Sequence, residues 1–190
     1  MKNKFGDLFI QIISVMIGVF LGFAVSNWAA QKKTNTQLQY LEQHIISEIK
    51  INQQKVTQVI DYHRTLRDSS RFYLQQERID VFKPNFFRGV NTLTLSNSAF
   101  ETGIQTGLIN DIPLQQIQEL NEVYTQQRAY EDFANLLLSG LITMDFEGDE
   151  MAMRKILLFL SVSMTDVVIK EEQLLESYKK AIQTIENTSD

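Results

Sequence analysis

The sequence predicts an all-α protein. An N-terminal transmembrane helix continues into a long stalk helix, which packs with two or three further helices as an antiparallel bundle outside the bilayer. Three observations lead to this fold: one apolar segment without ionised residues, three long blocks free of Gly and Pro, and apolar residues at three- and four-residue steps within those blocks. With 8 Gly and 2 Pro in 190 residues, a β-rich chain full of turns is disfavoured.

Residues 1–7 form a short N-terminal tail, and residues 8–30 form the predicted transmembrane anchor. As a helix this segment would span about 34 Å, enough to cross a hydrocarbon core of about 30 Å. Trp28 lies near its end, where an amphipathic ring favours the membrane interface. These features predict a single-pass protein in contact with membrane lipid.

A cleaved signal peptide is the alternative for the same segment, because Ala24 and Ser26 suit a small-residue cleavage site. The length of the apolar run and the absence of a helix breaker after Trp28 favour an uncleaved anchor. Two lysines flank the anchor on each side: Lys2, Lys4, Lys32 and Lys33. The N-terminal amine adds one more positive charge to the N-terminal side, and the more positive side of a membrane helix usually lies in the cytoplasm. This predicts an inner-membrane protein with its N-terminus in the cytoplasm and its helical domain in the periplasm.

Small and polar residues recur on one side of the anchor. This anchor stripe consists of Gln11, Ser14, Gly18, Gly22 and Ser26. Large apolar residues occupy the opposite side, and in lipid helices associate where small residues let two backbones approach closely. The stripe therefore predicts a helix-packing interface, either with another transmembrane protein or with copies of this chain.

Residues 31–190 are the predicted helical bundle domain, which begins with a stalk helix over residues 31–77. Its apolar stripe contains Leu38, Leu41, Ile45, Ile49, Val56, Val59, Leu66 and Tyr73. Asn52 and His63 fall on the same stripe, which makes His63 an interface residue rather than a catalyst. A break is expected near residues 67–71, because Ser and Asp compete for backbone hydrogen bonds.

A connector over residues 78–97 is rich in aromatic and β-branched residues, and an extended piece is expected around residues 90–95. A short helix should follow over residues 98–108. Its start carries the sequence SAFE, a capping box in which the Ser98 hydroxyl accepts from the third backbone N–H and Glu101 reaches back.

Gly103 and Gly107 lie four residues apart in this short helix. Glycine costs about 1 kcal/mol against alanine in a helix interior. Two glycines in register favour close-packing positions where another backbone approaches, and a poorly formed, kinked helix is the alternative.

Two further helices are predicted over residues 113–140 and 149–187. The second has a heptad pattern with Glu171 as its one polar exception. A second membrane span within it is disfavoured, because its apolar run of 14 residues includes Asp166 and is too short to cross a bilayer. A buried core helix explains this segment better.

The chemistry-bearing residues do not predict an enzyme. There is no Cys, no nucleophile elbow, no phosphate-binding glycine loop and no zinc-protease motif. His44 and Glu48 have the spacing of a shared metal site but lack a third ligand, so a solvated polar face is expected. No metal or cofactor site and no small-molecule substrate are predicted, and a net charge of −5 without a basic cluster disfavours nucleic acid.

Two stretches resemble a family of uncharacterised bacterial single-pass membrane-anchored helical proteins. They are IGVFLGFAVSNWAAQKK, with its Asn-Trp pair, and NSAFETGIQTGLINDIPLQQIQELNEVYTQQ. In the second, Phe100 stands at the family's aromatic place, Gly107 and Leu108 at its Gly-Leu place, and Tyr124 at its Tyr. The resemblance implies an anchored helical domain and supplies no catalytic residue.

Two functions remain open from the sequence. The favoured one is a non-enzymatic membrane-anchored interaction protein, an accessory subunit or scaffold seated by its anchor stripe, because such stripes ordinarily serve helix packing. The alternative is a membrane effector that self-associates through the same stripe into a homo-oligomeric assembly.

Overall fold

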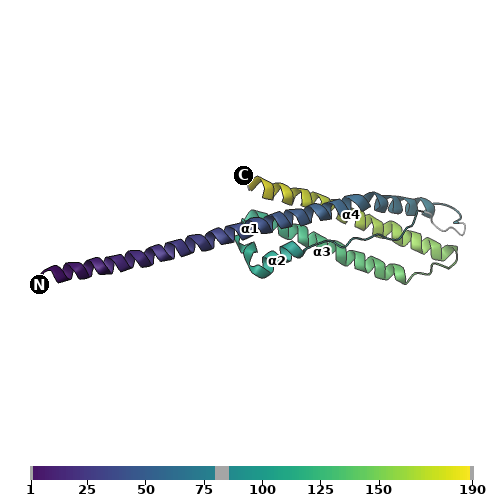
Figure 1. The fold of residues 1–190 in the computed structure, drawn as a ribbon. Coiled ribbons are helices and arrows are strands. Elements are labelled where there is room, and N and C mark those ends of the chain that lie inside the picture. Colours follow the sequence, from purple (N-terminus) through teal and green to yellow (C-terminus); the bar gives the residue numbers. More distant parts are fainter. Residues whose placement is uncertain (1, 80–85, 189–190) are drawn as a thin grey trace.

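The computed structural model describes residues 2–79 and 86–188, and every regular element within them is helical (Figure 1). Helix α1 runs over Lys2–Leu74, α2 over Ser98–Thr106, α3 over Leu114–Ile142 and α4 over Glu150–Thr188, with a 3-10 turn η1 at Leu108–Asp111. The prediction of an all-α chain with a long N-terminal helix is confirmed.

Helix α1 is one continuous rod, and its N-terminal part projects well beyond the other helices (Figure 1). With 73 residues it is about 110 Å long. The predicted break at residues 67–71 is wrong. In this stretch Ser70 is buried and Arg71 donates to Thr165 Oγ1 of α4 at 2.7 Å, so packing against α4 outweighs the local preference of Ser and Asp.

The second half of α1 and helix α3 both pack along α4, and both run antiparallel to it. On one side of α4, Lys50 pairs with Glu186 at 2.9 Å near its C-terminal end, and Arg71 meets Thr165 a few turns earlier. On the other side, Lys180 pairs with Glu119 at 2.9 Å, and Tyr130, further along α3, donates to Glu171, which lies earlier in α4. Antiparallel packing of the long helices is therefore confirmed.

The core lies between these three helices and follows the predicted stripes. The largest fully buried side chains are Tyr124, Tyr130, Tyr178, Ile45, Ile49, Leu66, Leu120, Leu160, Met164, Leu174, Ile185 and His63. In α4, Leu160 and Met164 come from the apolar run considered as a second span. Their burial among the other helices confirms the core-helix interpretation of that run.

The connector crosses the bundle without forming a strand over its described residues. Its backbone is bound by side chains instead: Asn52 of α1 donates to the Ser96 carbonyl at 2.7 Å and accepts from the Ser96 N–H at 2.9 Å. Glu131 of α3 accepts from the Leu95 N–H at 2.9 Å. These side chains satisfy the backbone groups that a neighbouring strand would otherwise satisfy. Residues 80–85 of the predicted connector lie outside the described residues.

Helix α2 differs from the sequence prediction at both ends. Its N-cap is Asn97 without a side-chain cap bond, and the Ser98 hydroxyl donates to Glu48 of α1, so the predicted capping box is not formed. The helix ends at Thr106 rather than at residue 108. Gly107 follows as a left-handed C-cap with φ of 76°, a conformation that glycine adopts without steric cost.

The two candidate close-packing glycines therefore have different roles. A Cβ at Gly103 would lie 2.9 Å from Leu41 Cδ2, so this glycine lets α2 approach α1 closely. The approaching atom belongs to a side chain and not to a backbone. A Cβ at Gly107 would meet nothing closer than Asn110 Nδ2 at 3.9 Å, so Gly107 is needed for its backbone conformation and the prediction of close packing is wrong there.

Candidate functional site

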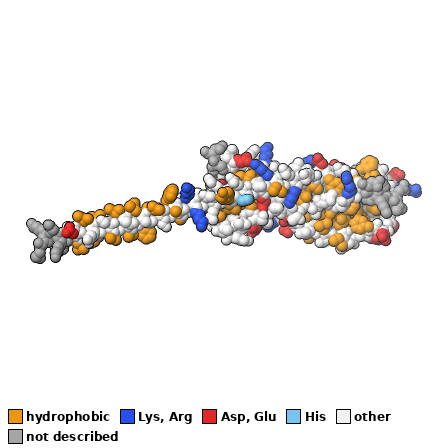
Figure 2. Space-filling view, in the orientation of Figure 1, with side chains coloured by type: hydrophobic (Ala, Val, Ile, Leu, Met, Phe, Trp, Pro, Cys, Tyr) orange, Lys and Arg blue, Asp and Glu red, His pale blue; other side chains and the backbone are white. Residues whose placement is uncertain are grey.

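The anchor stripe lies on the projecting part of α1. Figure 2 shows hydrophobic side chains along this arm, and Gln11, Ser14, Gly18, Gly22 and Ser26 are all exposed there. A Cβ added at either glycine would meet nothing within 4 Å. The Ser14 hydroxyl donates to the Ile10 carbonyl of its own helix at 2.8 Å. No described residue of this chain packs on the stripe, so any helix that covers it belongs to another molecule.

The arm is also the one described helix segment long and apolar enough to cross a membrane. None of its most apolar stretch is buried against the rest of the described chain. A core helix of a soluble protein would be buried, whereas a membrane span or a signal sequence would both leave this segment free.

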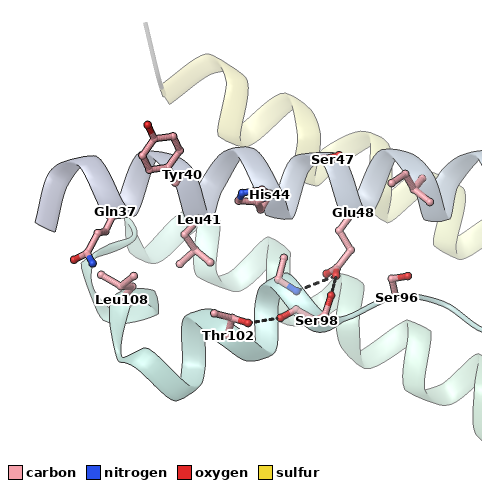
Figure 3. Close-up of a pocket in the computed structure, with 12 residues that line it drawn as sticks. Gln37, Tyr40, Leu41, His44, Ser47, Glu48, Ser96, Ser98, Thr102 and Leu108 are labelled. Atoms are coloured by element: carbon pink, nitrogen blue, oxygen red, sulfur yellow. Dashed lines mark hydrogen bonds between the residues drawn. The ribbon is translucent and has the colours of Figure 1, made fainter. Parts of the chain in front are cut away.

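A groove of about 570 Å³ lies between α1 and α2, at the end of the bundle nearest the arm (Figure 3). Leu41, Ile51 and Leu108 give it apolar walls, and Tyr40 is also among the residues that line it. The size falls within the usual range of about 300–1,000 Å³ for ligand pockets. The groove is open rather than enclosed, and its polar side chains include Gln37, His44, Glu48 and neighbouring Ser and Thr residues.

Glu48 is the centre of the polar contacts in this groove. Its Oε2 accepts from Ser98 Oγ at 3.0 Å and from the Ala99 N–H at 2.9 Å, and its Oε1 accepts from Tyr124 Oη at 2.7 Å. The carboxylate thereby caps the first turn of α2 from another helix, where the helix dipole favours a negative charge. Glu48 is buried, so the prediction that it belongs to a solvated face is wrong, whereas the neighbouring His44 is exposed.

Tyr124 connects this carboxylate to the core. Its ring stacks on Phe100 of α2 with centroids 4.1 Å apart. Burial raises the pKa of the Tyr124 hydroxyl well above its ordinary value, and the hydrogen bond to Glu48 raises it further. The hydroxyl therefore stays protonated and serves as a donor, which makes Glu48 and Tyr124 a structural clamp between α1, α2 and α3.

A second buried polar cluster joins α1 to α4. His63 Nδ1 lies 2.7 Å from Glu171 Oε1, and His63 Nε2 lies 2.7 Å from the Val90 carbonyl. Tyr130 donates to the same glutamate oxygen at 3.3 Å. The Val90 carbonyl accepts, so Nε2 carries a proton, and both ring nitrogens of His63 are engaged. His63 is thus an interface residue, as predicted, and it binds the connector to the core.

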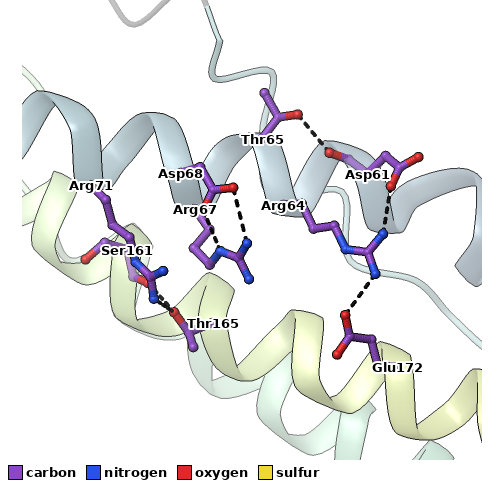
Figure 4. A network of polar contacts seen from close by, with 9 residues as sticks. All are labelled: Asp61, Arg64, Thr65, Arg67, Asp68, Arg71, Ser161, Thr165 and Glu172. Carbon is purple, nitrogen blue, oxygen red and sulfur yellow. Dashed lines mark hydrogen bonds and ion pairs between the residues drawn. The ribbon is translucent and has the colours of Figure 1, made fainter.

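Charged side chains lie on the surface of the same two helices, directly beside this cluster (Figure 4). Arg64 pairs with Asp61 at 3.0 Å and with Glu172 of α4 at 2.8 Å. Arg67 pairs with Asp68 at 2.7 Å, and this guanidinium lowers the pKa of the Asp68 carboxyl. The pairs are partly exposed, and such pairs contribute about 0–1 kcal/mol each. Arg64–Glu172 joins α1 to α4, whereas Arg64–Asp61 and Arg67–Asp68 lie within α1.

Within residues 2–79 and 86–188, no three His, Asp or Glu side chains lie together as a possible metal site. The structure brings Glu48 into a groove with His44 but supplies no third ligand there. Donors and acceptors of this chain satisfy the polar clusters described above, except that Glu171 Oε2 is buried without a hydrogen-bond partner. They position helices.

Comparisons with models of known protein families, with curated proteins and with solved structures give no match. The resemblance carried by the Asn-Trp pair and by the Phe100–Tyr124 stretch therefore stays an expectation.

The anchor stripe stays a prediction, and sequence reasoning missed the Glu48 clamp. A signal was present, because Glu48 lies between Ile45 and Ile49 on the core side of the stalk helix. An acidic residue at such a position needs hydrogen-bond donors nearby. The SAFE stretch provides two of them, the Ser98 hydroxyl and the Ala99 backbone N–H in the first turn of α2.

Proposed function

We propose that this protein is a single-pass membrane-anchored interaction protein, an accessory subunit or scaffold. Residues 8–30 lie in the inner membrane, and the bundle of residues 31–190 is displayed on the periplasmic side. The observation that carries the proposal is the projecting arm of α1, which is apolar, free of contacts with the described chain and continuous with the bundle. Because no described part of the chain packs against this helix segment, its apolar surface is available for lipid and for a partner helix.

The direction of the anchor stripe supports a partner that runs beside α1. At about 100° per residue, Ile45 of the buried face lies roughly 180° around the helix from Gly18. The stripe thus faces away from the bundle. Above the membrane the same outer side of α1 carries exposed uncharged residues: Thr36, Gln43, Ser47 and Gln54. A partner helix seated on the stripe can therefore continue along α1 without meeting α3 or α4.

The proposal is tested by purifying the full chain from its native membrane in mild detergent and measuring the mass of the intact complex. We expect a complex with another membrane protein. A complex of identical chains alone would favour the self-associating effector, and a bare monomer would contradict both. A mature N-terminus near Asn27, found by mass spectrometry, would show a cleaved signal peptide and overturn the anchor.

Gly22→Leu provides the matched test of the stripe. Nothing of this chain surrounds Gly22, so a leucine there leaves the bundle intact while holding a partner backbone away. Met16→Leu, on another side of the same helix, is the control. We expect Gly22→Leu to lose the partner and Met16→Leu to retain it. Equal recovery of the partner with both variants would show that the stripe is incidental.

A further inference from the structure

A second pocket, of about 520 Å³, lies between α1 and the connector. It is further along α1 from the arm than the groove, and the two share no lining residue. Its size also falls within the usual range for ligand pockets. None of the polar contacts of the Glu48 clamp reaches it, so it is a separate feature of the bundle.

The pocket is positively charged, although the chain as a whole has a net charge of −5. Lys55 of α1 and Arg88 of the connector line it, and no Asp or Glu does. Within residues 2–79 and 86–188, neither of these side chains takes part in an ion pair. The Lys55 ammonium donates to the Thr94 carbonyl at 2.9 Å, a bond that uses one of its three N–H donors. Both positive charges are therefore open to an anion.

Helix α1 holds the backbone that carries Arg88 in place. The Tyr62 hydroxyl accepts from the Arg88 N–H at 2.9 Å and donates to the Gly89 carbonyl at 2.5 Å. The next residue of α1, His63, binds the Val90 carbonyl. The Arg88 guanidinium also lies 5.9 Å from the centre of the Tyr62 ring, a distance at which a cation is attracted to an aromatic face. The positive side of the pocket is therefore arranged before any ligand arrives, which lowers the cost of binding.

Two left-handed backbone positions turn the connector over the pocket. The φ angles are 89° at Gly89 and 48° at Asn91. Asparagine is one of the few residues besides glycine that adopt this conformation, and such unfavourable backbone positions are concentrated at ligand sites. With this turn, the side chains of Asn91 and Thr92 line the same pocket as Arg88.

The charges and donors of the pocket match a phosphomonoester. Near pH 7 such a group carries a charge of about −1.5 to −2 and three strong acceptor oxygens. Lys55 and Arg88 supply two positive charges, and a guanidinium can bind two phosphate oxygens at once. Gln58, Asn91 and Thr92 add amide and hydroxyl donors. A carboxylate has one charge and two oxygens, so it would leave one of the two cations without a partner.

We propose that this pocket binds a soluble phosphomonoester, whose phosphate is held by Arg88 and Lys55. From Ala30 to Lys55 the unbroken helix α1 extends for about 38 Å. This is several times the screening length of about 8 Å, so a lipid headgroup at the end of the proposed anchor does not reach the pocket. Only the choice of a soluble source rests on the proposed function, because the charge and the geometry of the pocket do not involve the arm.

Isothermal titration calorimetry of the full chain, in a non-ionic detergent at low ionic strength, tests the proposal. The probes are glycerol phosphate, glycerate and glycerol, which share a three-carbon body and differ in the charged group. We expect glycerol phosphate to bind with a Kd of about 1 mM or tighter, and at least about tenfold more tightly than glycerate. Glycerol should give no binding heat. Absence of binding by glycerol phosphate at concentrations up to about 10 mM would overturn the proposal, and equal binding of glycerate would overturn the assignment to phosphate.

Three substitutions that each remove one positive charge locate the site. Arg88→Gln and Lys55→Gln change the pocket, whereas Lys179→Gln, on the exposed side of α4 and outside the pocket, is the matched control. We expect each pocket variant to weaken glycerol phosphate about tenfold or more, and Lys179→Gln to change its Kd by less than about twofold. Arg88→Lys keeps the charge but loses the planar fork, so its effect should be smaller than that of Arg88→Gln.

Circular dichroism checks that each variant retains its helices, and Arg88 is exposed, so its substitution leaves the core intact. Equal weakening by Lys179→Gln, or unchanged binding in both pocket variants, would show non-specific attraction and overturn the site. The titration does not depend on what covers the anchor stripe. Its failure would therefore leave the proposed membrane role standing, and loss of that role would leave the pocket to be judged by these binding data.

Discussion

Replacing Glu48 by alanine tests whether the groove is a structural clamp. The substitution removes the acceptor of three hydrogen bonds while keeping a good helix former in α1. The three donors differ in their surroundings. Tyr124 is fully buried, Ala99 is half-buried at the start of α2, and Ser98 is exposed. The Ser98 hydroxyl can therefore turn to water, and the cost of the substitution comes from the other two donors.

The magnitude follows from those two donors. A buried hydroxyl left without an acceptor costs about 1–3 kcal/mol, which is the expected cost at Tyr124. Loss of a helix cap costs about 0.5–2 kcal/mol, which applies to the Ala99 N–H. We therefore expect Glu48→Ala to lower the free energy of unfolding by about 1.5–5 kcal/mol. Glu48→Gln keeps an acceptor oxygen, and its amide can donate to the Tyr124 hydroxyl, so it should cost about half as much or less.

The assay is urea unfolding in detergent, followed by helical circular dichroism, together with amide hydrogen exchange at Ala99. In Glu48→Ala the Ala99 amide should exchange faster than in the native chain. Ser47→Ala, an exposed position beside the same groove, is the control and should change the unfolding free energy by less than about 0.5 kcal/mol. A loss below about 1 kcal/mol for Glu48→Ala, or an equal loss for Glu48→Gln, would refute the clamp.

Two other perturbations have definite outcomes. Gly107→Ala should destabilise the bundle by about 1 kcal/mol because φ is 76° there, whereas Gly18→Ala, in open space, should leave urea unfolding of the bundle unchanged. Burial raises the pKa of three tyrosines above the ordinary value of 10: Tyr124, Tyr130 and Tyr178. Their contribution to stability is complete below that value and is lost above it, by about 1.4 kcal/mol per pH unit for each tyrosine, because the unfolded chain releases the proton first. Absorbance titration of tyrosinate should show these three ionising only with unfolding, and ionisation of all six tyrosines near pH 10 in the folded chain would contradict this.

The helices were predictable because the apolar pattern that marks a helix lies among residues close together in the sequence. A three- and four-residue repeat of apolar side chains placed Ile45, Leu160 and Met164 in the core, and it marked His63 and Glu171 as polar residues on buried faces. The pairing of those two could not be read from the pattern. They are 108 residues apart, and only the register of α1 on α4 brings their side chains together.

The Glu48 clamp and the unbroken C-terminal part of α1, which the sequence did not predict, both depend on distant partners. Glu48 is bound by donors 50, 51 and 76 residues further along the chain. Local rules assigned Ser98 to a capping box, yet the Ser98 hydroxyl and the Ala99 N–H both donate to the carboxyl group of Glu48, which lies at the N-terminus of α2. At residues 67–71 the same local rules predicted a break, which the contacts of α1 with α4 prevent.

Because α1 is continuous, a change in the tilt of its N-terminal part moves the bundle at its other end. From Ala30 to Leu74 the helix is about 66 Å long and has no break within the described residues. In a bilayer, tilting the anchor by about 10° would swing the far end of the bundle sideways by about 11 Å, since membrane helices adjust their tilt to bilayer thickness. A sub-ångström change at the lipid boundary is thereby converted into a displacement larger than a helix radius at the tip. If residues 8–30 span a membrane as proposed, their orientation therefore sets the sideways position of the bundle's far end.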